Sequence, residues 1–380
     1  MYSADSYVGY CNILYEHLVT TACEVEVVEV TSEERKPGLS EAQRKKWGAS
    51  FPKDGVHRTT ERKLIDRIVS NNPDFLFLGI PGRKVFRICN NLERRQELNP
   101  SMTIATGFPG LQYYMKFTGL FWRAFVDRLL FTDPHLYQLG SKLLSRTPLR
   151  TTNCVLFGSP RIRDTPPRDK SIHRRYIAFF EQNEVPASRE QRIELSRQLA
   201  LLADAHKDKT LLIVARNRPG ETSNHQTDDD MRLDRILLQR EGRTVEVFNG
   251  DWLAIADEIE FALSVSSTAL LEASLMQIPS FSLRIARSDE TRFDAFRFFQ
   301  RLGFERAIDE LATSRVLEPL QGASEFLIPY DPATLSQVLS PRARPRRPAR
   351  SHEILLRRGC VAMAMSLDWS FRLLERQRVG

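Results

Sequence analysis

The residues best suited to chemistry are three consecutive hydroxyl side chains at the end of an apolar run. Ser266, Ser267 and Thr268, the hydroxyl turn, follow the apolar residues 259–265 and precede a helix-forming segment. Hydroxyl residues at a strand-to-helix junction can cap the helix, and the junction points free backbone N–H groups at any bound anion. Glu272 lies close enough to accept hydrogen bonds from a ribose. We therefore expect a nucleotide or nucleotide-sugar site; an ordinary capped helix is the alternative.

A second polar segment follows an apolar run over 211–215, which we expect to be a strand. Arg216 and Arg218 can each hold a diphosphate or carboxylate through paired hydrogen bonds. His225 can donate to a phosphate oxygen or protonate a leaving group. Because loops at the carboxyl ends of parallel strands line the binding crevice of open α/β sheets, this loop is a candidate partner of the hydroxyl turn. A solvated polar loop is the alternative.

Two further loops are expected at strand ends. Gln182 follows a strand over 176–180, and its amide can read a nucleobase edge or merely cap the loop. In the first half, Gly107, Phe108, Pro109 and Gly110 form a turn after a short strand. Glycines permit close backbone approach, which makes this turn a candidate acceptor-side loop, although a plain tight turn explains it almost as well.

The candidate general base lies near the amino terminus. Asp5 is a well-placed carboxylate on the expected first loop, before a helix over 7–19; N-capping of that helix by Asp5 or Ser6 is the alternative. An apolar strand normally precedes such a loop, yet only Met1 and Tyr2 stand before it. We therefore expect either a natural start upstream of Met1 or a domain without its first strand.

Strand-like and helix-like segments alternate in two series along the chain. Continuous apolar runs such as 75–80 are typical of buried parallel strands. This rhythm predicts parallel sheets with right-handed crossovers, and hence an α/β protein with two Rossmann-like domains facing a cleft and a C-terminal helical tail. The expected parts are an N-terminal acceptor domain over 1–150, a linker over 151–165, a C-terminal donor domain over 166–340, an Arg/Pro linker over 341–350 and an amphipathic helix over 351–380.

The net charge of +7 is concentrated in the tail. Residues 341–380 contain ten arginines and three acids, which equals the whole excess, so the rest of the chain is neutral and gives no reason to expect nucleic-acid binding. The tail helix carries an apolar stripe, for which we expect either the body of the protein or an anionic membrane surface as partner. The stripe consists of Leu356, Cys360, Met363, Leu367, Phe371 and Leu374.

The remaining composition excludes several classes. The five cysteines are scattered without CxxC spacing, which predicts reduced thiols in the cytoplasm rather than a zinc site or disulfides. The acidic run 228–230 fits the first turn of a helix better than a metal motif, so no metal site is expected. No apolar run reaches the length of a membrane span.

In this order, the motifs resemble bacterial GT-B glycosyltransferases. The similarity spans residues 1–312 and is closest to a poorly characterised group of these enzymes. It is carried by DSY at 5–7, FPG at 108–110, Arg123 with Asp127, FEQNEVP at 180–186, the Arg-rich segment with His225, and SVSSTALLEA with IPS over 264–280. The His loop and Ser-Ser turn also resemble bacterial sialyltransferases and Kdo transferases, which hold CMP-sugars there. That motif has Pro after the His, whereas here Gln226 follows.

The resemblance implies a metal-independent glycosyltransferase that needs no cofactor beyond its nucleotide-sugar substrate. A CMP-sugar is favoured over a UDP-sugar, and the acceptor is a cell-surface glycan or a lipid-linked molecule. His225 would hold the donor phosphate, with the hydroxyl turn, Arg216, Arg218, Glu221 and Glu272 around phosphate and ribose. The alternatives are a UDP-sugar 2-epimerase or polyol-phosphate transferase of the same fold, and a non-catalytic nucleotide-binding protein. The expected location is the cytoplasm or the inner face of its membrane.

Overall fold

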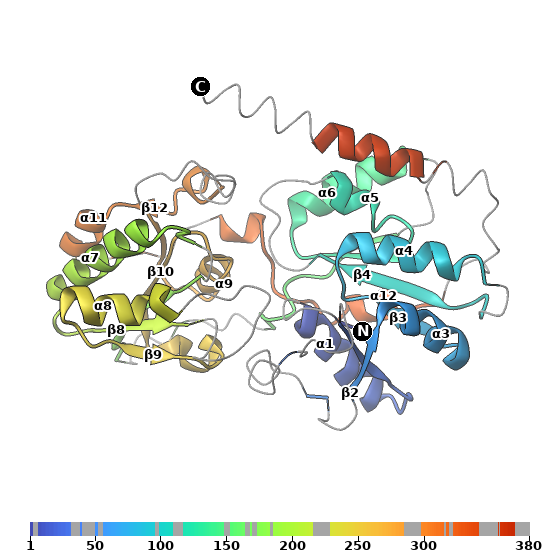
Figure 1. Ribbon diagram of the computed structural model, residues 1–380, viewed down its shortest axis with the longest axis horizontal. Coiled ribbons are helices and arrows are strands. Elements are labelled where there is room, and N and C mark those ends of the chain that lie inside the picture. Colours follow the sequence, from blue (N-terminus) through green and yellow to red (C-terminus); the bar gives the residue numbers. More distant parts are fainter. Residues whose placement is uncertain are drawn as a thin grey trace. The chain divides into compact units, whose positions relative to one another are not determined.

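The computed structural model forms two compact units, Met1–Arg161 with Tyr330–Gly380, and Ile162–Pro329 (Figure 1). The residues that it describes are 1–2, 7–31, 39, 50–51, 56–95, 99–108, 117–147, 153–163, 168, 173–182, 185–215, 229–284, 298–314, 317–318, 322–341, 356 and 358–368. None of the described helices is long and apolar enough to cross a bilayer.

The sheet of the first unit is parallel and has two parts, which the first two residues of the chain join. One set of strands runs in the order β3 (Phe75–Phe77), β4 (Thr103–Gly107), β5 (Arg128–Phe131) and β6 (Asn153–Leu156), and a pair consists of β1 (Val27–Thr31) and β2 (Val56–Thr60). Tyr2 bridges Glu29 of β1 and Gly79 beyond β3, both in parallel. Its N–H donates to Val28 at 3.0 Å, so Met1 and Tyr2 occupy the place of a central strand between β1 and β3.

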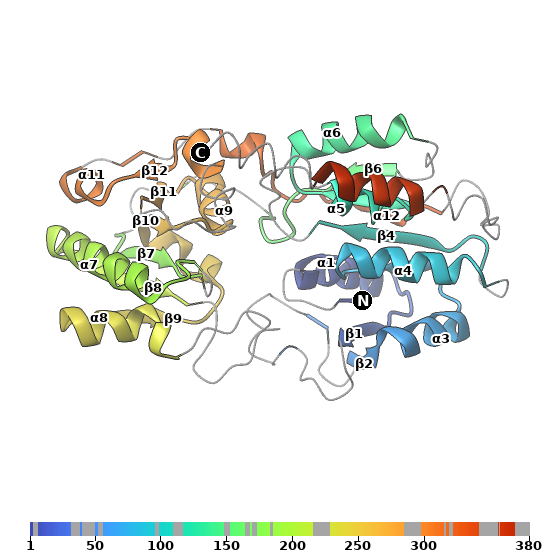
Figure 2. The same ribbon diagram turned by 45° about the horizontal axis from the view of Figure 1, so that its top comes forward.

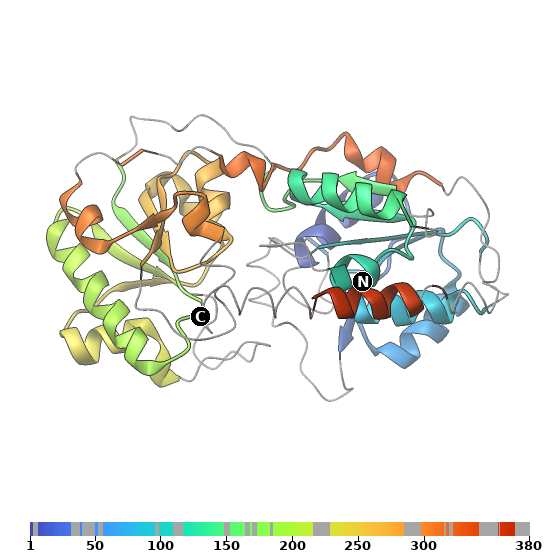
Figure 3. The same ribbon diagram turned by 90° about the horizontal axis from the view of Figure 1, so that it is seen from above.

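Helices cover both faces of this sheet. The helices α1 (Val8–Thr20) and α12 (Thr334–Leu339) share one hydrophobic core with Phe77 and Phe157. The opposite core contains α3 (Glu61–Asn71), α4 (Gly82–Leu92), α5 (Phe117–Phe121), α6 (Pro134–Ser145) and the C-terminal helix 358–368. In Figure 3, α12 and the red C-terminal helix lie on opposite sides of the sheet.

The C-terminal helix packs on the first unit mainly through residues outside the expected stripe. Val361 and Ala364 are buried in the core, whereas Met363 is 54% exposed. Asp368 accepts hydrogen bonds from the N–H groups of Phe117 and Thr118, at 2.9 and 3.0 Å, and from the Thr118 hydroxyl. Figures 1 and 2 show the helix beside α5. Of the predicted stripe, Cys360 packs against this core, whereas Leu356, Met363 and Leu367 are exposed. The stripe is therefore wrong as the docking face at these three positions, because the helix turns Val361 and Ala364 to the core instead; Phe371 and Leu374 lie outside the described residues.

The second unit contains a six-stranded parallel sheet (Figure 2). Its order is β12-β11-β10-β7-β8-β9, with strands β7 (Tyr176–Phe180), β8 (Thr210–Val214), β9 (Glu246–Phe248), β10 (Ile259–Ser264), β11 (Ser280–Leu283) and β12 (Glu305–Arg306). Counted from β7 as first, this is the 3-2-1-4-5-6 order of dinucleotide-binding Rossmann folds.

The helices of the second unit pack against the apolar faces of these strands. One core joins the sheet to α7 (Arg189–Ala205), α8 (Leu233–Glu241) and α11 (Ile308–Thr313). On the other face, Phe180 contacts Trp252 of η4 (Trp252–Glu258), with ring centroids 5.2 Å apart. The helix α9 (Ala269–Leu275) connects β10 to β11. Ser188 caps α7, accepting a hydrogen bond from the Gln191 N–H.

Two predicted boundaries are wrong. The linker expected over 151–165 contains β6, which pairs with β5 in the first sheet. The donor domain expected over 166–340 ends earlier, because Tyr330, Leu335 and Val338 belong to the core of the first unit. The Arg128 guanidinium fixes this return by donating to the Gln337 carbonyl at 3.0 Å and the Ser340 hydroxyl at 2.9 Å.

Candidate functional site

The second sheet has a topological switch point between β7 and β10. The strands β7, β8 and β9 follow one another toward one edge, and β10, β11 and β12 toward the other. Ligands of open α/β sheets bind outside the carboxyl ends of the strands at such a point. The residues that leave the two strands there are Glu181 with Gln182, and Val265 with the hydroxyl turn.

Gln182 and Ser266 join the two strand ends. The Gln182 Oε1 atom accepts hydrogen bonds from the Ser266 N–H at 3.0 Å, the Ser266 hydroxyl at 3.2 Å and the Ser264 hydroxyl at 3.4 Å. The Gln182 Nε2 group makes no hydrogen bond to any residue that the structure describes, which leaves it as a donor. The amide therefore holds the hydroxyl turn in place, while its role at a nucleobase stays a prediction.

The hydroxyl turn presents backbone donors. The carbonyls of Ser267 and Thr268 accept from Leu270 and Leu271, at 3.1 and 3.0 Å, and start α9. The Ser267 hydroxyl accepts from the Ala269 N–H at 3.3 Å. The N–H groups of Ser267 and Thr268 donate to no described residue, and both residues are half-buried. Two adjacent N–H donors thus stand at the switch point, as an anion site requires.

Glu272 lies farther along α9 than the hydroxyl turn. It is buried, with 6% of its surface exposed. The structure thus places Glu272 on the same strand-to-helix connection as Ser266, and its expected contact with a ribose stays a prediction.

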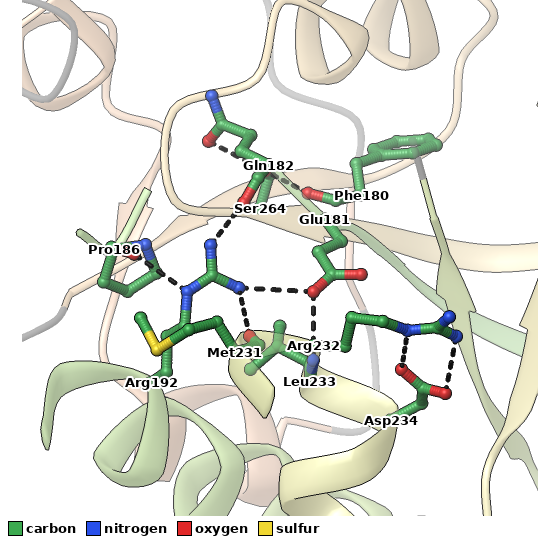
Figure 4. Close-up of polar contacts among 10 residues, drawn as sticks. All are labelled: Phe180, Glu181, Gln182, Pro186, Arg192, Met231, Arg232, Leu233, Asp234 and Ser264. Carbon is green, nitrogen blue, oxygen red and sulfur yellow. Dashed lines mark hydrogen bonds and ion pairs between the residues drawn. The ribbon is translucent and has the colours of Figure 1, made fainter. Parts of the chain in front are cut away.

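A buried ion pair supports the switch point from below (Figure 4). Arg192 of α7 is fully buried and donates to Glu181 Oε1 at 3.3 Å, and also to the carbonyls of Gln182, Pro186 and Met231 at 2.8, 3.0 and 2.8 Å. The Glu181 Oε1 atom also accepts from the Leu233 N–H at 3.0 Å, at the start of α8. These contacts fix the loop that carries Gln182.

The burial of this pair perturbs both of its charges. Loss of hydration raises the pKa of the Glu181 carboxyl, and it lowers the pKa of the Arg192 guanidinium. The sequence reasoning missed the pair, because Arg192 stands in a charged helix where an exposed arginine is the ordinary case. A signal that points to it is Glu181 in FEQNEVP, an acidic residue directly after an apolar strand.

Several predicted site residues lie outside the described part of the chain: Asp5, Pro109, Gly110, Arg216, Arg218, Glu221 and His225. The segment that carries His225 begins after β8, which pairs with β7. Ala215, the last described residue before it, donates to the Phe248 carbonyl at 3.0 Å. The segment therefore starts from the same edge of the sheet as Gln182.

The described part of the acceptor-side loop is buried. Gly107 ends β4, where a Cβ atom would stand 3.1 Å from Tyr10 Cζ, so the glycine accommodates the Tyr10 ring. The Phe108 ring lies 4.8 Å from the guanidinium carbon of Arg123. Among the described residues, no group of three or more His, Cys, Asp or Glu side chains is placed to hold a metal ion.

The sequence matches, over residues 2–286, a family described as "Putative glycosyltransferase (DUF6716)". The chain belongs to this family. No curated protein matches it.

Solved structures with a similar fold are named as epimerases. A "putative UDP-N-acetylglucosamine 2-epimerase" from Listeria monocytogenes is 12% identical, with a TM-score of 0.55 over 88% of this chain and 92% of that one. The UDP-GlcNAc 2-epimerase of Methanocaldococcus jannaschii, in complex with UDP-GlcNAc and UDP, is 10% identical, with a TM-score of 0.50 over 84% and 93%. At these identities the likeness shows the fold, which is two Rossmann-like domains of the GT-B type.

Proposed function

We propose that the protein is a glycosyltransferase that binds a nucleotide-activated sugar at the switch point between β7 and β10. The observation that carries this proposal is the pair of N–H donors of Ser267 and Thr268 beside Gln182. Family membership supports the reaction class. The product is a cell-surface polysaccharide or a lipid-linked precursor of one.

The proposed chemistry needs no dedicated metal. The acceptor hydroxyl oxygen attacks the anomeric carbon, and the bond from that carbon to the donor phosphate oxygen breaks. The N–H groups of the hydroxyl turn, with His225, Arg216 and Arg218, stabilise the negative charge that develops on the leaving phosphate. Asp5 takes the proton of the acceptor hydroxyl. Glu221 and Glu272 complete the ribose and phosphate contacts.

The donor carries a pyrimidine base. The sequence resemblance implies CMP, and the structures of similar fold are named for UDP-GlcNAc. Gln182 Nε2 donates to a base carbonyl in either case. A thermal-shift screen of CMP, CDP, UDP, GDP and their sugars identifies the donor, and the largest shift is expected from a cytidine or uridine compound. Preference for a guanosine compound contradicts this assignment.

The backbone donors can be tested by removing one N–H. Thr268 has φ −58°, which proline adopts, so Thr268→Pro deletes the N–H with its backbone angle unchanged. A lost hydrogen bond to a charged group corresponds to roughly a tenfold or greater loss of nucleotide affinity. Thr268→Ala is the matched control, because it keeps the N–H. Calorimetry that finds equal affinity in Thr268→Pro and Thr268→Ala removes the turn from the donor site, as does unchanged affinity in both Ser267→Ala and His225→Ala.

A UDP-sugar 2-epimerase is the second candidate, favoured by the names of the solved structures. The two activities differ in their need for an acceptor. A labelled UDP-sugar that changes configuration without any acceptor supports the epimerase, whereas label transferred to an acceptor supports the glycosyltransferase. Nucleotide affinity without either product leaves a binding protein.

The arginine-rich tail suggests where in the cell the protein binds its acceptor. Five arginines lie between positions 342 and 350, and the C-terminal helix leaves Leu356, Met363 and Leu367 exposed. Anionic lipid attracts basic segments by about 1 kcal/mol per residue near the surface. We therefore infer salt-sensitive binding to the inner face of the cytoplasmic membrane. Flotation with anionic vesicles at low salt tests it: replacing these five arginines by glutamine abolishes binding, and equal binding by both proteins contradicts it.

A further inference from the structure

The first unit contains a buried arginine whose described partners are all uncharged. Arg123 is 6% exposed. Its Nη2 donates to the Tyr7 hydroxyl at 2.9 Å and its Nη1 to the Gly119 carbonyl at 3.0 Å, and the guanidinium lies over the Phe108 ring. The Nε atom is buried without a hydrogen bond to any described residue, and no described carboxylate pairs with the side chain. A buried charge of this kind is costly unless an opposite charge arrives.

The same guanidinium stands at the positive end of a helix. A Cβ atom at Gly82, the first residue of α4, would overlap Arg123 Nη1, so only glycine admits the guanidinium in this position. The first turn of α4 contains no acid, and Arg83 and Lys84 follow Gly82. Since the dipole of an 11-residue helix repels a cation at its N-terminus, the helix adds to the excess positive charge.

The start of α4 also offers backbone donors. The Pro81 carbonyl accepts from Lys84 and Val85, at 2.8 and 3.1 Å, and no side chain in the described part of the chain caps the helix. The N–H groups of Gly82 and Arg83 donate to no residue in the described ranges. Two N–H groups and one guanidinium edge thus point to a single kind of ligand, an oxyanion.

The location matches that of the donor site in the other unit. Tyr7 follows the Tyr2 strand position, Gly82 follows β3, and Phe108 follows β4. The chain reverses across the first sheet between Tyr2 and β3, with β1 on one side and β4 on the other. The Arg123 cluster is therefore at the switch point of the first unit.

We propose that the first unit binds a carboxylate or phosphate group at the N-terminus of α4, held by Arg123 and the N–H groups of Gly82 and Arg83. This group belongs to the acceptor, which makes the acceptor an anionic glycan or a phosphate-bearing lipid-linked molecule. The assignment to the acceptor rests on the proposed glycosyltransferase function, whereas the anion site itself does not.

The anion site can be tested with inorganic phosphate and the full chain. Hydrogen exchange followed by mass spectrometry is expected to show phosphate-dependent protection of residues 79–92, relative to chloride at equal ionic strength. Thr268→Pro keeps this protection, because it alters only the second unit. Arg123→Gln and Gly82→Ala lose it, the first by removing the charge and the second by displacing it. Phosphate-dependent protection that is confined to residues 266–275, or no protection at all, overturns the proposed anion site.

A matched control separates a lost site from a damaged fold. Arg128→Gln also removes a buried arginine of the first unit, but that side chain donates to Gln337 and Ser340 instead. Arg128→Gln is expected to lower Tm and keep the phosphate response. Arg123→Gln is expected to lose the response with a smaller decrease in Tm, because it also relieves an uncompensated charge. An equal loss of the phosphate response in both variants overturns the proposal.

Once a transferred product is known, kinetics test the acceptor assignment. Arg123→Lys is expected to raise the acceptor KM by roughly tenfold or more and to leave the donor KM unchanged, since lysine lacks the guanidinium fork. A raised donor KM with an unchanged acceptor KM assigns the anion to the donor and overturns this part. Phosphate protection in a protein without transferase activity refutes the proposed function and leaves the anion site standing.

Discussion

The carboxamide oxygen of Gln182 lies 3.0 Å from the backbone nitrogen of Ser266, 84 residues further along the chain. The contact joins the ends of β7 and β10, which pair in parallel in the sheet. Its effect is to hold the hydroxyl turn so that the N–H groups of Ser267 and Thr268 stay together. The proposed donor site therefore depends on Gln182 for the shape of the hydroxyl turn as well as for the predicted contact with a base.

Replacing Gln182 separates its two roles. Gln182→Leu leaves the buried Ser266 N–H without an acceptor, which costs about 1–3 kcal/mol of unfolding free energy. Gln182→Glu keeps the acceptor oxygen but removes Nε2, so it is expected to retain stability and weaken nucleotide binding by charge repulsion. Urea unfolding and calorimetry measure the two effects. Gln198→Leu, on α7 of the same unit, is the control, and equal stability of Gln182→Leu and wild type contradicts the positioning role.

Removing Arg192 is expected to be severe. Arg192→Met leaves the Glu181 carboxylate buried without its partner, at a cost of about 3–5 kcal/mol. Adding Glu181→Gln removes the unpaired charge and recovers part of that loss in urea unfolding. Arg197→Met, which breaks an exposed pair with Glu194 on the same helix, is expected to cost less than about 1 kcal/mol. If the double variant is less stable than Arg192→Met alone, this account is contradicted.

Asp133 makes stability depend on pH. It caps α6 by accepting from the Leu136 N–H at 3.0 Å, and burial raises its pKa to about 6. The protonated form is favoured in the folded state, so its contribution is full below about pH 4 and is lost as the pH rises through about 6. Asn caps a helix equally well without titrating. Asp133→Asn is therefore expected to gain about 2–3 kcal/mol over wild type between pH 4 and 7; parallel pH profiles in urea unfolding contradict it.

Asp368 anchors the C-terminal helix. Asp368→Ala leaves the first N–H groups of α5 without their acceptor, so residues 358–368 are expected to detach more often from the first unit. Hydrogen exchange in these residues should accelerate by roughly tenfold or more, as expected for the loss of charge-assisted bonds. Met365→Ala, an exposed position on the same helix, should leave the exchange unchanged. Equal exchange in the two variants contradicts the anchoring role.

The fold was predictable where local pattern and burial agree. Apolar runs such as 176–180 are typical of buried parallel strands, and Ser188 has the hydroxyl that suits the start of α7. Three features escaped because they depend on distant partners. Arg192 has no local sign of burial, and Ala364 is too small to mark an apolar stripe. Tyr330 packs against Phe157, which lies far earlier in the chain.

The meeting of Gln182 and Ser266 at the switch point was predictable only in part. Ser266 and Gln182 were chosen for their hydroxyl and amide groups at strand ends, and the strand order brings those ends together. Nothing local reveals that the two side chains bind each other. Arg123 belongs to a sequence motif, but only the fold shows that its described neighbours, which include Gly82, Tyr7 and Phe108, are uncharged.

The return of the chain to the first unit bears on the order of events at the ribosome. The second unit is one continuous stretch, Ile162–Pro329, so all its strands have been synthesised before the tail emerges. The first unit must wait for α12 and the C-terminal helix to cover its two faces, and for Gln337 and Ser340 to meet Arg128. Domains generally fold as units during synthesis. The half that is translated first is therefore completed last, and during that interval it is the half exposed to chaperones and proteases.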